Sequence, residues 1–178
     1  MKKINVTIKG ICPLLQHRFR ESEHGAKATR SKKKVYDEVE EAEKALYKDS
    51  KGIICHPSEH IFASMIKAGV YFKFEGKKTF KDIIKGGVII EPDMIPLNKD
   101  TYDEIDSRAV VIQRARVMCW RPKFNDWELT FDITILDEDS ISTTTLKEIL
   151  EFAGARMGIG DYRPRFGRFQ IIEWKEEK

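Results

Sequence analysis

The chain has 178 residues, of which 41% are hydrophobic and 34% are charged, and its formal net charge is +3. This length suits one domain with a single core, and the composition excludes an intrinsically disordered chain. No apolar run approaches the roughly 20 residues of a membrane span, and the N-terminal segment lacks the apolar region of a signal peptide. We therefore expect a cytoplasmic protein that makes no membrane contact.

The cysteines give no sign of a metal centre or of a disulfide framework. Cys12, Cys55 and Cys119 lie far apart in the chain and form no CxxC pair. An odd number of cysteines at such spacing argues against both structures. We expect three buried free thiols, no metal and no cofactor.

The N-terminal half predicts one strand and two helices. Ile4, Val6 and Ile8 alternate with polar residues, which indicates a half-buried strand. A basic stretch at about 20–34 has almost no large apolar residue and is predicted to be a flexible insert. Apolar periodicity then predicts a helix over 35–49 and a second helix that begins near Ser58 as N-cap and ends near Gly69.

The C-terminal half is richer in strand signals. The segment 86–92 is predicted to be a short strand or edge segment, and two β-branched runs, 108–120 and 127–136, are predicted to pair as a long hairpin. A helix capped by Ser142 or by a following threonine leads through a glycine-rich loop into a last strand. The order of elements predicts an α+β fold, a ferredoxin-like βαββαβ sheet in one domain spanning 1–178. The basic stretch and the helix after it form an insertion behind the first strand.

Positive charge is concentrated in three stretches, although the net charge is small. Residues 17–34 carry seven Lys/Arg against two acids, 108–123 carry five basic residues and no acid, and 156–168 carry four arginines against Asp161 alone. Clustered positive charge in a balanced chain is typical of a protein that binds a polyanion. The alternative is three unrelated solvated patches.

The glycine-rich segment 157–172 is the most distinctive part of the sequence. It follows a helix and precedes a strand, which is the reverse of a dinucleotide-binding GxGxxG, and it lacks the Gly-Lys-Ser/Thr of a P-loop. Glycines can still expose backbone N–H groups to an anion. Arginines suit phosphates, and aromatic rings can stack on bases.

The order of elements and the loop sequence "GIGDYRPRFGRF" resemble the RAMP superfamily, the RNA-binding proteins of CRISPR systems. The matching loop positions are Gly158, Gly160, Arg163 and Gly167. The resemblance implies a ferredoxin-like fold and assembly side by side along a strand. The chain is shorter than most backbone subunits of this superfamily, and its loop has extra arginines where the family often has glycines. A virus- or prophage-encoded relative acting outside a CRISPR complex therefore stays open.

The resemblance also covers repeat-processing endoribonucleases, in which a histidine often acts as general base. His17 and His24 are weak candidates for that role, since no spacing fixes a partner for either. His56 and His60 are four residues apart, but Pro57 lies between them, so we do not expect them to share a helical face as a zinc pair would. Arg114 and Arg116 have an alternative role in cross-strand ion pairs with Asp132 and Glu128.

The sequence thus predicts a non-catalytic protein that binds single-stranded DNA or RNA through its phosphates, largely without sequence specificity, as a homo-oligomer along the strand in a prokaryotic or virus-infected cell. The alternatives are a metal-independent endoribonuclease and a subunit whose basic loops dock an acidic protein. The predicted binding residues are His17, Arg18, Arg20, Lys27, Arg30, Lys32, Lys33, Lys34, Arg114, Arg116, Arg163, Arg165, Arg168, Tyr162 and Phe166, with Gly158, Gly160 and Gly167 shaping the loop backbone.

Overall fold

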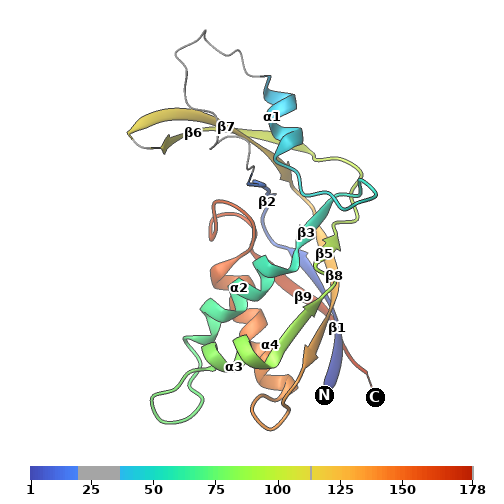
Figure 1. Cartoon of the computed structure of the whole chain (residues 1–178), viewed down its shortest axis with the longest axis vertical. Helices are drawn as coiled ribbons and strands as arrows, with labels where there is room; N and C mark the ends of the chain where they lie inside the picture. Colours follow the sequence, from blue (N-terminus) through green and yellow to red (C-terminus); the bar gives the residue numbers. More distant parts are fainter. Residues whose placement is uncertain (20–36, 113, 178) are drawn as a thin grey trace.

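The computed structural model describes residues 1–19, 37–112 and 114–177 (Figure 1). The basic insert at about 20–34 lies outside the described residues. In chain order the elements are β1 (Lys2–Gly10), β2 (Leu14–Leu15), α1 (Glu38–Lys44), β3 (Cys55–Pro57), α2 (Ser58–Gly69), α3 (Phe80–Gly87), β4 (Val88–Glu91), β5 (Met94–Pro96), β6 (Glu104–Ile112), β7 (Ala115–Phe124), β8 (Glu128–Ile135), α4 (Thr143–Phe152), the π-helical turn η2 (Ala153–Met157) and β9 (Phe169–Glu176).

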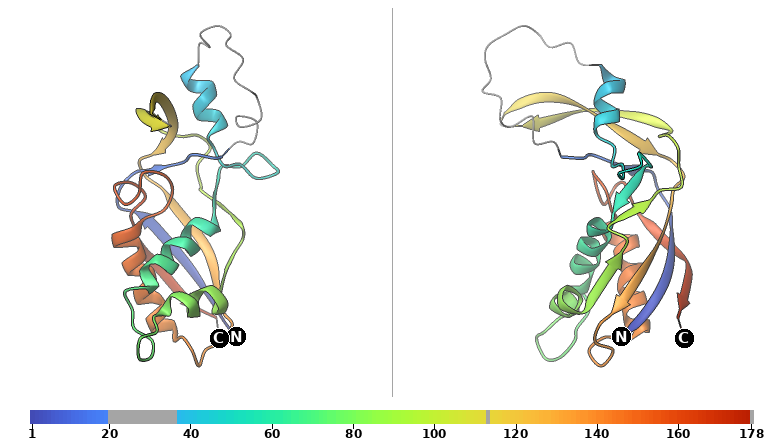
Figure 2. Two further views of the ribbon diagram at one scale, coloured as in Figure 1. Left: turned by 60° about the vertical axis from the view of Figure 1, so that its left-hand side comes forward. Right: turned by 45° about the vertical axis from the view of Figure 1, so that its right-hand side comes forward.

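An antiparallel sheet with the strand order β4-β8-β1-β9 forms the centre of the molecule. Helices α2, α3 and α4 cover one face of this sheet (Figures 1 and 2). The mixture of antiparallel strands and separate helices confirms the predicted α+β class.

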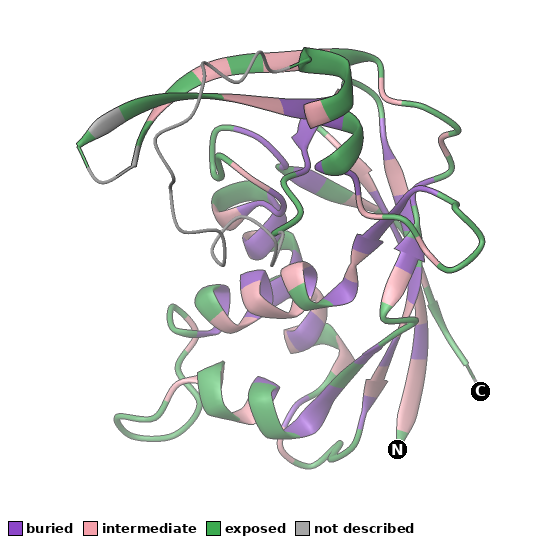
Figure 3. Ribbon diagram, turned by 45° about the horizontal axis from the view of Figure 1, so that its top comes forward, coloured by how far each residue is buried: buried purple, intermediate pink, exposed green. Residues whose placement is uncertain are grey.

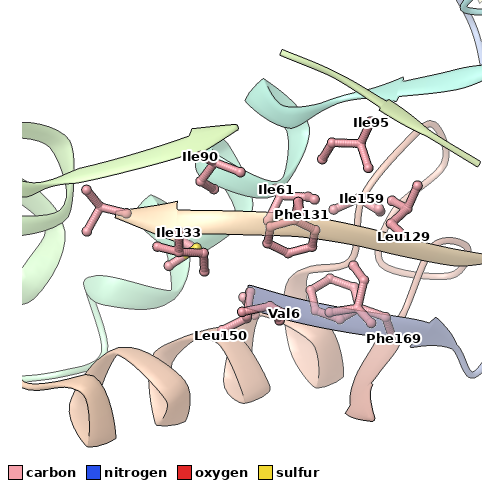
Figure 4. Packing of buried hydrophobic residues seen from close by; sticks show 14 of the residues in the cluster. Val6, Ile61, Ile90, Ile95, Leu129, Phe131, Ile133, Leu150, Ile159 and Phe169 are labelled. Carbon is pink, nitrogen blue, oxygen red and sulfur yellow. The ribbon is translucent and has the colours of Figure 1, made fainter. Parts of the chain in front are cut away.

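The main core lies between the sheet and these helices because the strands alternate. Val6 of β1 lies opposite Phe131 of β8, and Ile4 lies opposite Ile133, so their side chains share one face. All four are fully or almost fully buried and belong to the core cluster. Figure 4 shows Val6, Phe131 and Ile133 of this cluster together with Ile61 of α2 and Leu150 of α4. Burying a side chain of this size contributes about 1.5–3 kcal/mol relative to exposure, which fixes the register of β1 and β8.

The opposite face of the sheet is polar and internally paired. Lys9 Nζ donates to Glu128 at 2.8 Å, and the hydroxyls of Thr7 and Thr130 lie 3.1 Å apart. Asp132 contacts Lys3 at 2.9 Å. The predicted ion pairs of Arg114 and Arg116 with Asp132 and Glu128 are therefore wrong, because lysines of β1 are the partners of these acids.

The predicted hairpin of 108–120 with 127–136 is also wrong. The first run turns back on itself after Ile112, so β6 pairs with β7, while β8 pairs with β1 and β4. The turn passes through Arg114, whose φ of 71° lies in the left-handed region. No glycine or proline marks this turn, so the sequence reads as one continuous strand.

A second sheet projects from the main one. Its order is β2-β7-β6, and helix α1 packs against β6 and β7 (Figure 1). Much of the hairpin is exposed (Figure 3), and Val111 near its turn has 71% of its surface accessible. The two-residue strand β2 connects this sheet to the glycine-rich loop, because the loop forms a backbone hydrogen bond with Leu15 of β2.

The helix ends follow ordinary capping chemistry. Ser142 caps α4 as predicted, its Oγ accepting a hydrogen bond from the Thr145 N–H at 3.1 Å. Ser58 is not the cap of α2: the extended Pro57 holds that position and Ser58 is the first helical residue. The short elements α3, β3 and β5 were not predicted.

Candidate nucleic-acid interface

The glycine-rich loop, residues 158–168, is built against the segment that follows β1. The N–H of Asp161 donates to the carbonyl of Leu15 at 2.9 Å, and the N–H of Gly167 donates to that of Pro13 at 2.8 Å. A third bond, from the Ile159 N–H to the Gly167 carbonyl at 2.9 Å, closes the loop on itself. These backbone bonds give the loop a fixed shape.

The loop glycines are required by this shape. Gly158, Gly160 and Gly167 have φ values of 67°, 74° and 72°, a region that residues with a Cβ rarely adopt. A Cβ on Gly160 would lie 2.5 Å from the Leu15 carbonyl oxygen, and one on Gly167 would overlap that of Ile159. The glycines therefore allow a close approach of backbone segments.

The loop presents three arginines to solvent. Arg163, Arg165 and Arg168 are exposed, and none of them forms an ion pair with a carboxylate of the described residues. Arg18 and His17 are also exposed, just beyond β2. With Tyr162 and Phe166, seven of the predicted binding residues thus lie on the loop or on the segment that packs against it.

Asp161 connects the loop to two other segments. Its carboxylate lies 2.5 Å from Arg121 Nε of β7 and 3.4 Å from His17 Nδ1. The hydrogen bond from His17 and that from Arg121 hold the pKa of Asp161 well below its ordinary value. Because Arg121 is only 4% exposed, its charge depends on Asp161 for compensation.

Tyr162 and Phe166 already have cationic neighbours. The Arg108 guanidinium lies 5.2 Å from the Tyr162 ring centroid and 4.9 Å from that of Phe166, and Arg121 lies 5.0 Å from the Tyr162 ring. Phe166 is 8% exposed, whereas Tyr162 is 39% exposed. Of the two predicted stacking residues, Tyr162 has the more accessible ring.

Sequence reasoning missed Arg108 and Arg121 as partners of the loop. Both belong to the stretch 108–123, whose five basic residues without an acid indicate a binding surface. The wrongly predicted hairpin, however, did not place either arginine next to the loop. Arg114 and Arg116 are exposed near the turn of the hairpin, and among the residues that the structure describes no contact joins them to the loop. The remaining predicted residues lie outside the described part of the chain, namely Arg20, His24, Lys27, Arg30, Lys32, Lys33 and Lys34.

A pair of histidines lies beside the loop, of which His56 is buried and His60 is half-buried. As expected, the two do not share a helical face, because His56 belongs to β3 and His60 to α2. His56 Nε2 and His60 Nδ1 are 3.1 Å apart, and the Tyr47 ring packs edge-on against both. Burial and the positive charge of Arg163 lower the pKa of each histidine, so the pair is neutral at pH 7. No cluster of three or more metal-ligating side chains exists among the residues that the structure describes.

The three cysteines are free thiols, but only Cys55 is buried as predicted; Cys12 and Cys119 are half-buried. Cys12 lies beside the loop, where its Sγ accepts a hydrogen bond from the Arg168 N–H at 3.2 Å. Within the described ranges, no helix is long and apolar enough to cross a bilayer.

Comparison with known proteins gives a likeness of fold and none of sequence. No protein-family model matches the chain, and no curated protein matches it. A solved structure with a similar fold is a chain in the cryo-EM structure of the Type III-B Cmr-beta bound to cognate target RNA, with a TM-score of 0.61 at 9% identity. The match covers 99% of this chain and 61% of that one, so the present chain spans less than two thirds of its neighbour's length. The protein therefore has a fold similar to that of a chain in this RNA-bound structure.

Proposed function

We propose that the protein binds single-stranded nucleic acid, DNA or RNA, through its phosphates and without catalysing a reaction. The observation that carries this proposal is the set of Arg163, Arg165 and Arg168, exposed on a rigid loop and unpaired with any described carboxylate. Forked guanidinium donors held on a fixed backbone suit phosphate oxygens. The fold likeness to a chain of an RNA-bound assembly supports the same class of ligand.

The proposal includes a ferredoxin-like architecture of the RAMP type in one domain. Its support is the position of the helices: α2 and α3 lie between β1 and β4 in the chain, and α4 lies between β8 and β9. With the strand order β4-β8-β1-β9, these elements correspond to the βαββαβ arrangement. The β6–β7 hairpin and α1 are then additions to that core.

Binding of labelled oligo(dT) and oligo(U) over a salt series tests the proposal. Affinity should fall steeply with salt, and each of Arg163→Ala, Arg165→Ala and Arg168→Ala should weaken binding and reduce the salt slope by about 1 if it removes one phosphate contact. Lys51→Ala is the matched control: it removes an exposed cation in the turn before β3 and should leave the salt slope unchanged. If neither strand binds at low salt, the proposal is wrong, and the alternative that the basic loops dock an acidic protein is favoured instead.

Assembly along a strand is the part of the proposal that rests on the resemblance to the superfamily. It predicts cooperative binding, with affinity per site rising as the oligonucleotide is lengthened to hold several copies. Sedimentation of the protein with strands of increasing length measures the number of copies bound. One copy per strand at every length would contradict assembly without contradicting binding.

A second candidate function is metal-independent RNA cleavage, favoured by the contact of His17 with Asp161. A carboxylate 3.4 Å from Nδ1 can orient the exposed imidazole, so that its other nitrogen, Nε2, serves as a general base. This function would be supported if the protein cleaves an RNA strand in the presence of a metal chelator, and if the cleavage is lost in His17→Ala and kept in Lys51→Ala. The corresponding DNA strand should stay intact, because it lacks the 2′-hydroxyl nucleophile.

A further inference from the structure

The connection between α2 and α3, residues 70–79, is a second site with the chemistry of a strand-binding surface. We call it the α2–α3 ribbon. The Phe74 N–H donates to the Lys78 carbonyl at 2.9 Å, and the Phe80 N–H donates to the Phe72 carbonyl at 3.1 Å. Lys73 and Thr79 form an antiparallel bridge. These bonds make the connection a short ordered turn rather than an open loop.

The ribbon presents an aromatic ring on a supporting stack. The Arg156 guanidinium lies 5.8 Å from the Phe152 ring centroid, and the Tyr71 ring lies 5.2 Å from Phe152 at a tilt of 35°. Tyr71 is nevertheless 69% exposed. One side of the phenol ring is therefore supported by Phe152 while much of the ring stays open to solvent, which is the arrangement of a base-stacking platform.

The charge around the platform is positive. Between residues 67 and 85 the sequence has six lysines and two acids. The one ion pair within this group joins Lys85 to Asp82 at 3.9 Å. The others form no ion pair with a described carboxylate: Lys67, Lys73, Lys77, Lys78 and Lys81. Unpaired cations interleaved with aromatic rings are complementary to a single strand, which offers phosphates and bases together.

The platform and the glycine-rich loop lie at opposite ends of the same helix. The loop passes the start of α2, where the positive charge of Arg163 helps to lower the pKa of His60. The ribbon begins where α2 ends (Figures 1 and 2). The 12 residues of α2 span about 18 Å, a length that about five stacked nucleotides cover at about 3.4 Å each. Arg156, in the turn η2 that leads into the loop, contacts Phe152 beneath the platform.

We propose that a single strand bound at the glycine-rich loop continues along α2 and stacks a base on Tyr71, with its phosphates near the lysines of the α2–α3 ribbon. This inference rests on the proposed function and adds a second, separate contact to it. It places the strand on the helical side of the molecule, away from the polar face of the sheet, where the cations are already paired.

Two lengths of oligo(U), four and fifteen nucleotides, test the inference with the full chain. Tyr71→Ala should weaken binding of the longer strand by at least about 5-fold and leave the tetranucleotide, held at the loop alone, unchanged. Tyr71→Trp should restore the loss, since it keeps an aromatic ring. Ile89→Ala, at an exposed position of β4 outside the ribbon (44% exposed), is the control and should have no effect on either length.

The outcomes separate this inference from the function on which it rests. If the unaltered protein binds neither length, the proposed function fails and the inference fails with it. If it binds both and Tyr71→Ala binds both equally well, the platform is overturned while loop binding stands, and an acidic protein becomes the better occupant for the ribbon. Thermal unfolding of each variant checks the fold, which an exposed residue should not disturb.

Discussion

Asp161 joins three segments that are far apart in the chain. It contacts Arg121 of β7 and His17 beyond β2, and its own N–H is bonded to Leu15. Its carboxyl group has a lowered pKa because these donors favour the ionised form. A group with a depressed folded pKa stabilises the protein above its unfolded pKa, about 3.9 for Asp, and the stabilisation is lost as the pH falls below that value.

We therefore predict that Asp161→Asn destabilises the protein by about 1–3 kcal/mol near neutral pH, because Arg121 stays buried without its counter-charge. The difference in unfolding free energy from the unaltered protein should be constant down to about pH 4 and should shrink below it. Urea unfolding at a series of pH values measures this. Asp126→Asn is the control, since that surface contact with Lys9 at 3.4 Å contributes about 0–1 kcal/mol. Equal effects of the two substitutions would contradict the role of Asp161.

Gly167 is the loop position where a side chain is least tolerated. Its φ is 72° and a Cβ would overlap the Ile159 carbonyl, so Gly167→Ala should destabilise the protein by more than about 1 kcal/mol. Gly86→Ala is the control, because that helical position has open space around it and alanine favours a helix by up to about 1 kcal/mol. Thermal unfolding should give shifts of opposite sign. A melting temperature unchanged by Gly167→Ala would show that the loop is not held as described.

At the level of elements, the sequence predicts regular periodicity well and tertiary pairing poorly. β1, β4, α2, α4 and β9 follow from alternation or from apolar spacing, which are local signals. The β6–β7 turn cannot be predicted in this way, because no residue near Arg114 breaks the strand-like pattern of the sequence. The pairing of β8 with β1 cannot be predicted either, because it joins residues over 100 positions apart in the chain. The same limit explains the site. The loop glycines and arginines are visible in the sequence, whereas the contacts of Arg108 and Arg121 with Tyr162 exist only after the hairpin folds over the loop.

Helix α4 offers a local test of the capping chemistry. Ser142→Ala removes the hydrogen bond to the Thr145 N–H and should lower the free energy of unfolding by about 1 kcal/mol. Thr144→Ala, at an exposed position of the first turn, should change it little or raise it slightly, because alanine has the better helix propensity. Chemical denaturation of the two variants compares them directly. A loss in Thr144→Ala as large as in Ser142→Ala would contradict the assignment of the cap.

On the scale of the whole molecule, charge divides the surface into two kinds of region. The open face of the main sheet carries acids and lysines in pairs, so its field is nearly cancelled there. The glycine-rich loop and the α2–α3 ribbon carry exposed cations without described partners. A polyanion is therefore attracted to the loop and to the helical side.

Ultraviolet cross-linking of the protein to oligo(U), followed by mass spectrometry of the joined peptides, tests the central claim most directly. The expected cross-links fall in the glycine-rich loop, at Tyr162 in particular, and in the α2–α3 ribbon at Tyr71, and they should disappear as salt is raised. Cross-links confined to the polar face of β1 and β8, with none in the loop, would contradict the account.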